Sequence, residues 1–273
     1  MSVATSLPLE RFAPIDLQGL VGEAALMTRV DRKYVLSREA AARVIESLAV
    51  GIRILEIDGL RAFRYESVYF DTPDLLSFRM AAQPRRRRFK LRTRTYVDSR
   101  TAFLELKTRG ARSATVKDRI EYEPSDRHLL TEEARGYAAD ALDAIGVGAP
   151  RAEALDVRLT TLYQRATFVA PDASARSTVD VDLEWRDAAG PALVTPGMAI
   201  IETKSGARAS DFDRALWRAG HRPVSISKYG TGLAALHPEL PRNKWARLLR
   251  TDFTDRNRTH QNRSEESSCE TAV

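Results

Sequence analysis

Along most of the chain, apolar and polar residues alternate with a period of two, which is the pattern of strands that bury one face. This pattern predicts nine strands, at 28–36, 52–57, 62–71, 86–97, 101–109, 114–123, 158–169, 176–186 and 198–204. A chain with so many strands of this kind is dominated by β-structure.

Three segments between these strands have helical character instead. Residues 37–49 combine an apolar stripe with Ser37 as a candidate N-cap, and a second helix is predicted over roughly 127–146. A third helix is expected to begin at Ser210, where Asp213 completes the pattern of a capping box.

Helices inserted among antiparallel strands predict an α+β fold. Because closure would remove the exposed edges of the sheet, we expect a closed antiparallel β-barrel with helices packed outside it. Residues 1–21 are predicted to be a peripheral segment and 22–250 a single domain. The polar residues 251–273 are expected to form a disordered tail.

The polar side of the predicted strands carries an unusual number of charges. Lys90, Arg92 and Arg94 share one face of their strand, opposite Phe89 and Leu91. The same alternation groups Glu105 with Lys107, Lys117 with Arg119, and Asp180 with Asp182 and Glu184. On a single strand such charges are most simply a solvated surface. Across a closed sheet they would line the interior, where charges persist by pairing, by hydration or by binding a charged ligand.

Composition and charge favour an anionic ligand. The chain has 43 Lys and Arg against 37 Asp and Glu, a net charge of +6, and its cations are concentrated at 85–94. Arg and Lys bind phosphate oxygens and carboxylates bind hard cations, so a basic interior with a few carboxylates suits a phosphate chain and a divalent metal. The run 85–88 is interpreted as the mouth that attracts the polyanion.

Several classes of protein are disfavoured. The only cysteine, Cys269, lies in the polar tail, which excludes a disulfide framework or a cysteine metal site and fits a reducing compartment. No run is apolar enough to span a bilayer and no secretion signal is evident, so we expect a cytoplasmic protein. P-loop and Ser/His/Asp patterns are absent, and we expect no covalent intermediate. Few aromatic residues interleave with the cations, which disfavours a nucleic-acid interface.

A series of short motifs occurs in a fixed order along the chain. They are Arg32-Lys33-Tyr34-Val35, Val68-Tyr69-Phe70-Asp71-Thr72, Lys90-Leu91-Arg92-Thr93-Arg94-Thr95-Tyr96, Glu105-Leu106-Lys107-Thr108, Val116-Lys117-Asp118-Arg119, Tyr163-Gln164-Arg165, Arg176-Ser177-Thr178-Val179-Asp180, Ile201-Glu202-Thr203-Lys204 and Ser227-Lys228-Tyr229-Gly230. The ordered set resembles the vacuolar transporter chaperone (VTC) domain, the polyphosphate-polymerase branch of the triphosphate tunnel fold. The resemblance covers roughly residues 22–236.

The resemblance implies a basic tunnel and assigns residues to it. The phosphate-binding residues would be Lys33, Arg92, Arg94, Lys107, Lys117, Arg165, Arg176 and Lys228, with Tyr163 and Ser227 as supporting contacts. The catalytic residues would be Lys33, Arg92, Arg94, Lys107, Arg165 and Lys228, with Glu202 as the ligand of Mn²⁺ or Mg²⁺. Each residue also has a simpler interpretation, as a solvated strand charge, an ion-pair partner or, for Tyr163, a core aromatic.

The reaction implied by the resemblance is transfer of the γ-phosphate of ATP to a growing polyphosphate chain. ATP and polyphosphate would be the partners, duplex nucleic acid would be excluded, and export of the polymer would need a separate membrane protein. A non-catalytic polyphosphate or inositol polyphosphate sensor stays open, although Glu202 and the carboxylates at 180–184 disfavour it. A tunnel-fold triphosphatase also stays open. Triphosphatases of this fold carry Glu-x-Glu-x-Lys on the first strand, where this chain has Arg29-x-Asp31-x-Lys33.

Overall fold

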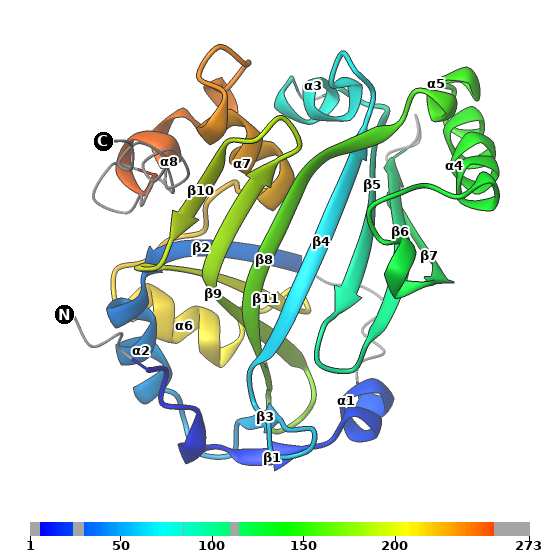
Figure 1. The fold of residues 1–273 in the computed structure, drawn as a ribbon. Coiled ribbons are helices and arrows are strands. Elements are labelled where there is room, and N and C mark those ends of the chain that lie inside the picture. The colour runs from blue at the N-terminus through cyan, green and yellow to red at the C-terminus, as the bar shows by residue number, and fades with distance from the viewer. Residues whose placement is uncertain (1–5, 24–29, 84, 110–114, 254–273) are drawn as a thin grey trace, which may run out of the picture.

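The computed structural model describes residues 6–23, 30–83, 85–109 and 115–253, which form one large, mostly antiparallel sheet with helices around it (Figure 1). The strands are β1 (Ala13–Ile15), β2 (Val30–Ser37), β3 (Arg53–Leu55), β4 (Phe63–Asp71), β5 (Arg88–Tyr96), β6 (Thr101–Arg109), β7 (Thr115–Tyr122), β8 (Asp156–Val169), β9 (Ala175–Asp187), β10 (Ala192–Thr195) and β11 (Met198–Ser205). The α-helices are α1 (Leu17–Glu23), α2 (Arg38–Glu46), α3 (Leu76–Ala82), α4 (Glu132–Ala144), α5 (Pro150–Glu153), α6 (Asp211–Arg218), α7 (Lys228–Leu236) and α8 (Ala246–Thr251). Short 3₁₀ turns are η1 (Leu9–Arg11), η2 (Pro124–Asp126) and η3 (Asn243–Trp245).

The nine predicted strands all correspond to strands of the sheet, and the predicted helices correspond to α2, α4 and α6. The side chain of Ser37 caps α2 by accepting from Ala40 N–H, as expected. Ser210 and Asp213 form the predicted capping box at the start of α6. Alternation and capping chemistry are local signals, which explains why they located these elements.

Eight strands follow one another through the sheet in the order β2-β11-β9-β8-β4-β5-β6-β7, with every neighbouring pair antiparallel. β10 pairs with β9, β3 pairs with β8, and β1 runs parallel to β3. Phe12, Ile15 and Leu20, around β1 and α1, are buried, so this part of the N-terminal segment packs against the sheet.

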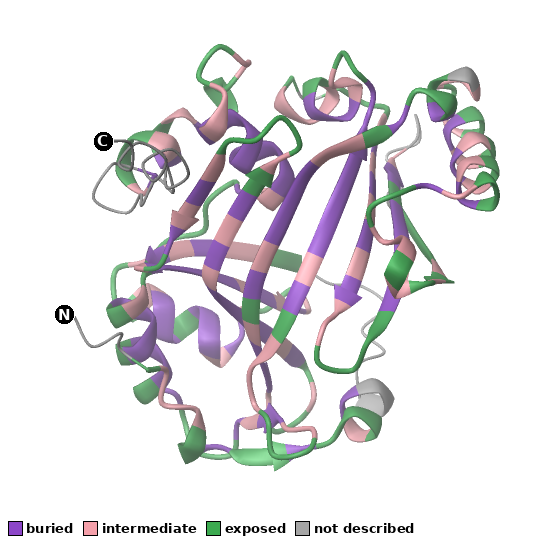
Figure 2. Ribbon diagram, viewed as in Figure 1, coloured by how far each residue is buried: buried purple, intermediate pink, exposed green. Residues whose placement is uncertain are grey.

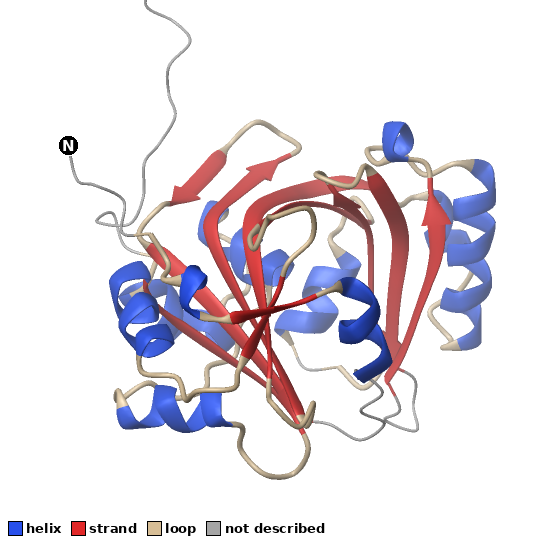
Figure 3. Ribbon diagram, turned by 90° about the horizontal axis from the view of Figure 1, so that it is seen from below, coloured by secondary structure: helices blue, strands red, loops and turns tan. Residues whose placement is uncertain are grey.

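The sheet is curled but open, so the prediction of a closed antiparallel β-barrel is wrong. Within the described ranges, β2 and β7 stand at the two ends of the strand order and do not pair with each other. Figure 3 shows from below how the strands curl around a shared interior. A period-two pattern predicts individual strands, but it does not determine whether the first and last of them meet.

The two edge strands are protected by means other than closure. Along β2, the segment before α7 contributes a backbone hydrogen bond, in which Val224 N–H donates to the Lys33 carbonyl at 2.7 Å. β7 exposes Lys117, Asp118 and Arg119. Charged side chains on an edge strand discourage pairing with another chain. The edge problem, on which the barrel prediction rested, is therefore solved locally at each end.

The outer face of the sheet is apolar and covered by helices. α2 and α6 pack around Tyr34, Val179 and Ile201, which come from β2, β9 and β11. α4 packs over the other half of the sheet, around Val68 and Leu91. Figure 2 shows the buried positions along these strands. Burial of this face by helices leaves the opposite, inner face, which carries Lys90, Arg92 and Arg94, as the polar one.

Helix α7 packs on the inner face, which corrects the expectation that all helices lie outside. Tyr229 and Leu233 of α7 share a core cluster with Leu183 and Trp185 of β9. This helix was not predicted, because two glycines in its first two turns, Gly230 and Gly232, are poor helix formers. A Cβ at Gly232 would lie 2.2 Å from the Trp185 ring, so glycine is required there for close packing.

Gly230, on the same helix, has the equivalent role toward a second tryptophan, with a Cβ there 2.5 Å from the Trp245 ring. Both indole rings are almost fully buried. The approach of α7 to the sheet thus depends on tertiary contacts rather than on helix propensity. None of the described helices combines the length and the hydropathy that a bilayer crossing needs.

Candidate functional site

The inner face collects charged and polar side chains from eight strands and from the start of α7. Among them are Lys33 on β2, Ser67 and Tyr69 on β4, Lys90, Arg92 and Arg94 on β5, Glu105 and Lys107 on β6, Lys117 on β7, Tyr163 and Arg165 on β8, Arg176 and Asp180 on β9, Glu202 and Lys204 on β11, and Ser227 and Lys228 at α7. Residues directly opposite each other in register share a face. Every site residue predicted from the sequence therefore lies on this face or on the helix against it.

The curl brings the two ends of this face close together. Burial lowers the pKa of Lys107 on β6, and the nearby Lys33 on β2 lowers it further. These residues belong to opposite ends of the strand order. Their interaction shows that cations from both halves of the sheet face a common space.

Glu105 is buried among three cations. Its carboxylate accepts hydrogen bonds from Arg92 at 2.6 and 3.0 Å, and lies 3.5 Å from Arg94 and 3.9 Å from Lys117. Burial alone would raise the pKa of Glu105, but these cations lower it to about 2. Arg92 also donates to Tyr69 Oη at 3.1 Å. The Glu105 side chain is 5% exposed, so it orients the arginines and is closed to a ligand.

Asp180 has a similar position in the other half of the face. Arg165 donates to its two oxygens at 2.6 and 2.8 Å, and Lys228 forms a second ion pair with it. Burial opposes ionisation, yet Arg165 and Lys228 lower the pKa of Asp180 to about 2. The Lys228 ammonium also lies 4.4 Å from the centre of the Tyr163 ring. Asp180 thereby ties α7 to β8 and β9.

A bulge in β9 separates Asp180 from the next two carboxylates. Asp182 has a positive φ of 52°, and the pairing of β8 with β9 shifts register there. Asp182 pairs with Arg38 at the start of α2, and Glu184 pairs with Arg186. The expected acidic face formed by Asp180, Asp182 and Glu184 is therefore wrong, because strict alternation does not continue through a bulge.

Glu202 is held by lysines rather than arginines. Lys33 and Lys204 lie 2.8 and 3.3 Å from its two oxygens. Burial would raise the pKa of Glu202, but Lys33 and Lys204 hold it well below its usual range. Its side chain is 20% exposed, against 5% for Glu105 and 2% for Asp180. Among these three carboxylates, Glu202 is the most accessible to a ligand.

Lys90 links β5 to the start of α7. Its ammonium donates to Ser227 Oγ at 2.9 Å, and Ser227 caps α7 by accepting from Gly230 N–H at 3.2 Å. Burial lowers the pKa of Lys90 to about 7, with further contributions from Arg92 and Lys107. Burial is the larger cause, and the neighbouring cations act in the same direction.

Several polar groups of the inner face are buried without a hydrogen-bond partner. They are the hydroxyls of Ser67, Thr161, Tyr163 and Thr178, and Nε of Arg94. Burial would raise the pKa of the Tyr163 hydroxyl, but Arg94, Arg165 and Lys228 lower it overall. Buried polar groups are normally satisfied, so these donors are available to a ligand or to water.

The arginine run at the start of β5 forms a separate cationic patch. Arg85, Arg86 and Arg87 are exposed and Arg88 is half-buried. Arg87 donates to the Gly146 carbonyl at 3.2 Å. Burial lowers the pKa of Arg88, as does the neighbouring arginine from the end of β6. Through Arg88, the first residue of β5, this patch extends the row of cations formed by Lys90, Arg92 and Arg94.

Comparison with protein families identifies the chain. The family model of the VTC domain matches residues 28–237, most of the sequence. The chain belongs to the VTC domain family. The resemblance inferred from the ordered motifs is thus confirmed. None of the curated proteins compared with the chain matches it.

Among solved structures, the VTC chain is similar to a putative adenylyl cyclase from Hippeastrum described as having a dominant triphosphatase activity. The two are 14% identical with a TM-score of 0.46, over 75% of this chain and 94% of that one. A putative adenylate cyclase from Vibrio parahaemolyticus is 14% identical with a TM-score of 0.36, over 86% and 95% of the two chains.

Glu202, the expected metal ligand, is the most exposed of the three carboxylates Glu105, Asp180 and Glu202, so it is the one that could hold a divalent metal. The described residues contain no group of three or more carboxylate, His or Cys side chains arranged to hold an ion. Mg²⁺ commonly binds one or two carboxylates together with substrate phosphates. An ion at Glu202 would therefore be shared with a bound phosphate. Arg29, which stands where triphosphatases of this fold carry the first Glu, lies outside the described residues.

Some residues of the face received no binding role from the VTC resemblance. Lys90 was placed beside Arg92 by alternation but was not assigned to the site, and Lys204 lies two residues from Glu202 on the same strand. Ser67 and Thr161 carry no such signal, because a single hydroxyl on a buried strand fits either face. Glu105 and Asp180 pair with arginines of neighbouring strands. These partners could be identified only from the register of the sheet.

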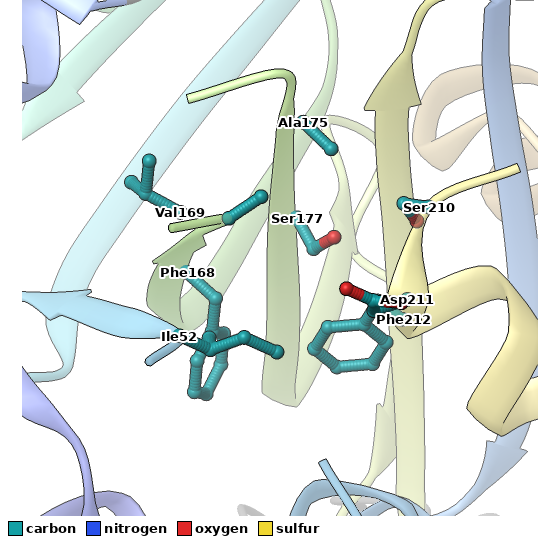
Figure 4. A pocket seen from close by; sticks show the side chains of 9 residues that line it. Ile52, Phe168, Val169, Ala175, Ser177, Ser210, Asp211 and Phe212 are labelled. Atoms are coloured by element: carbon teal, nitrogen blue, oxygen red, sulfur yellow. The ribbon is translucent and has the colours of Figure 1, made fainter. Parts of the chain in front are cut away.

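The hollow in Figure 4 lies on the other side of the sheet, at the start of α6. It is lined mostly by apolar groups, including Phe168 and Phe212, with Ser177 and Ser210 among the few polar ones. Ser210 already bonds Asp213 in the capping box. This hollow is separate from the charged inner face.

Proposed function

We propose that this VTC domain transfers the γ-phosphate of ATP to a growing polyphosphate chain on its inner face. The observation that carries the proposal is the surplus of positive charge there. Glu105, Asp180 and Glu202 are each already paired with two or more cations. Lys90 and Lys107 have lowered pKa values beside further cations. A linear polyanion would supply the missing negative charge along the whole face.

The transfer needs positioning and charge neutralisation more than covalent chemistry. An oxygen of the terminal phosphate of the chain would attack the γ-phosphorus of ATP, the bond to the β–γ bridging oxygen would break, and ADP would leave. Arg92 and Arg165 are held rigidly by Glu105 and Asp180, so their free N–H groups are preorganised for phosphate oxygens. Lys33, beside Glu202, and Lys228, which shares Asp180 with Arg165, add further positive charge.

Metal chemistry would involve Glu202. Glu202 would hold Mn²⁺ or Mg²⁺, which would supply positive charge to neutralise the phosphates. Lys33 and Lys204 now occupy both oxygens of Glu202. Each lysine can turn from the carboxylate to a phosphate when the ion is shared, because a lysine ammonium is a flexible point charge.

A binding module without catalysis is the second candidate, and one observation favours it. Asp182 and Glu184 pair with arginines away from the inner face, so two of the carboxylates that argued for a metal site do not contribute to it. A sensor for polyphosphate or inositol polyphosphate would use the same cations without needing turnover.

One experiment separates these functions. The purified protein is incubated with ATP and Mn²⁺, and the products are tested for a polymer that exopolyphosphatase degrades. We expect such a polymer together with stoichiometric ADP. Release of orthophosphate without polymer would instead identify a triphosphatase. Tight binding of tripolyphosphate with no turnover would identify the binding module.

A further inference from the structure

A row of buried polar side chains, here called the polar row, lies on the inner face between two pairs of stacked tyrosines. Tyr65 and Tyr163 stack with ring centroids 5.3 Å apart, and Tyr69 stacks on Tyr229 of α7 at 5.1 Å. Ser67 stands between Tyr65 and Tyr69 on β4, so its hydroxyl is on the same face and between the two pairs.

The polar row contains hydrogen-bonding groups that have no partner within the described protein. Ser67 is opposite Arg94 of β5 and Thr161 of β8, which puts these three side chains in one row across three strands. Ser67 and Thr161 are 0% and 1% exposed, Tyr163 is 3% exposed, and none of their hydroxyls has a partner. Nε of Arg94 is also buried without one. Arg94 pairs with Glu105 through another nitrogen, but the hydroxyls of the row and this Nε have no partner, which indicates a ligand.

The row ends at a wall. Thr161 is opposite Trp185 of β9, which is fully buried and donates from its indole N–H to the Lys228 carbonyl at 2.9 Å. Behind Trp185, helix α7 approaches so closely that only glycine fits at position 232. A chain of phosphates entering along the β5 cations would have to stop here.

We propose that Arg94, Ser67, Thr161 and Tyr163 form a subsite for the terminal phosphate of a linear phosphate chain. The proposal rests on the proposed function in so far as the ligand is a phosphate chain, and it names Ser67 and Thr161 as specificity-determining residues. A terminal phosphate has three non-bridging oxygens, one of which can carry a proton near neutral pH. Hydroxyls match it because they both donate and accept.

The subsite also explains why neutral groups occur in a basic interior. Cations bind internal and terminal phosphates alike through charge. Hydroxyls at a closed end respond to the number and protonation of oxygens, and thereby distinguish a chain end from the middle of a chain. The positive charge of Arg94 attracts a phosphate to the subsite, although the neighbouring tyrosine rings are apolar.

The test compares the Ser67→Ala/Thr161→Val double variant with the Thr95→Val control. Thr95 lies on the outer face of β5, is 7% exposed, and its hydroxyl likewise has no partner. Calorimetry measures binding of linear tripolyphosphate and of cyclic trimetaphosphate, which has no chain end. We expect wild type and Thr95→Val to prefer the linear compound, and the double variant to lose about tenfold in affinity for it. Its affinity for the cyclic compound should stay unchanged.

Equal loss for both compounds would overturn the subsite, since general disruption would then explain it. Unchanged affinity for both would also overturn it and leave the hydroxyls to water. The single Thr161→Val variant, which preserves volume, replaces the double variant if that one does not fold. Because binding needs no turnover, a protein that makes no polymer can still show the subsite. A polymer-forming protein with unchanged discrimination would overturn the subsite alone.

Discussion

The carboxylates of the inner face occur in two different settings. Glu105 and Asp180 are buried and grasped by arginine forks, with side chains 5% and 2% exposed. Glu202 is 20% exposed and is held by two lysines at 2.8 and 3.3 Å. Residues of the same type and charge therefore have different surroundings on a single sheet.

The difference assigns different tasks to them. An arginine fork bound to a buried carboxylate has a fixed geometry, and removal of either partner leaves an uncompensated charge. Lysines paired with the partly exposed carboxylate of Glu202 can move at little cost in free energy, because these ion pairs are partly solvated. Glu105 and Asp180 thus preorganise cations for an anion, whereas Glu202 is open to exchange its partners. Four changes test this contrast.

The largest effect is expected for Asp180→Asn, which removes the common partner of Arg165 and Lys228. Breaking a buried ion pair in this way should lower the free energy of unfolding by about 3 kcal/mol, as measured by urea denaturation. Asp182→Asn is the matched control across the bulge. Its side chain is 37% exposed, so we expect a loss below about 1 kcal/mol. Equal losses would remove the distinction between buried and open carboxylates.

For Glu202→Gln we expect the opposite combination of effects. Polymer synthesis should fall about 100-fold, because the amide keeps the shape but lacks the charge that a hard divalent ion needs. Stability and tripolyphosphate affinity should stay close to wild type, since the basic residues remain. Synthesis under matched Mn²⁺ and calorimetry with tripolyphosphate measure the two. Synthesis at the wild-type rate would place the metal elsewhere.

Gly232→Ala tests whether the arginine-held region depends on the position of α7. A Cβ 2.2 Å from the Trp185 ring forces the helix or the indole to move, which should cost about 2 kcal/mol of unfolding free energy. Thermal unfolding checks this. The control is Gly136→Ala in α4, where a Cβ meets nothing within 4 Å and helix propensity should stabilise the fold by roughly 0.5 to 1 kcal/mol. A stabilised Gly232→Ala would contradict the packing argument.

The smallest effect is expected for the pH dependence of tripolyphosphate affinity, to which the ammonium of Lys90 contributes. Burial, Arg92 and Lys107 lower the pKa of Lys90 to about 7, with further contributions from Lys33 and Lys244. A bound anion favours the charged ammonium, so the complex takes up a proton and affinity falls as pH rises above the pKa of the free protein.

If the complex keeps Lys90 charged throughout, this titration should weaken tripolyphosphate binding by up to about 15-fold between pH 7 and pH 8.5. Lys90→Arg should flatten the profile, because arginine keeps its charge throughout this range. Calorimetry in buffers of different ionisation enthalpy separates proton uptake by the protein from titration of the ligand. Identical profiles for both proteins would assign the effect to the ligand.

Local signals in the sequence were enough for much of the fold. The alternation of Lys90, Arg92 and Arg94 with apolar residues predicted β5 and the cationic face it contributes to. Ser210 and Asp213 predicted the start of α6 through capping chemistry. The motifs also identified the family, because they recur in a fixed order over residues that the VTC match covers. The first two signals depend on residues within one strand or one helical turn, and the third depends on the order of such local motifs along the chain.

Tertiary structure decided the rest. Whether the sheet closes depends on where β2 and β7 end in space, and the Val224 bond to β2 could not be deduced from either segment alone. The bulge at Asp182 redirects two carboxylates by inserting one residue into the pairing of β8 with β9. Helix α7 has glycines where two tryptophans approach, so packing overrides propensity. The sequence itself contains the charged residues and their two-residue alternation. The register and curl of the sheet determine which partner each charged residue contacts.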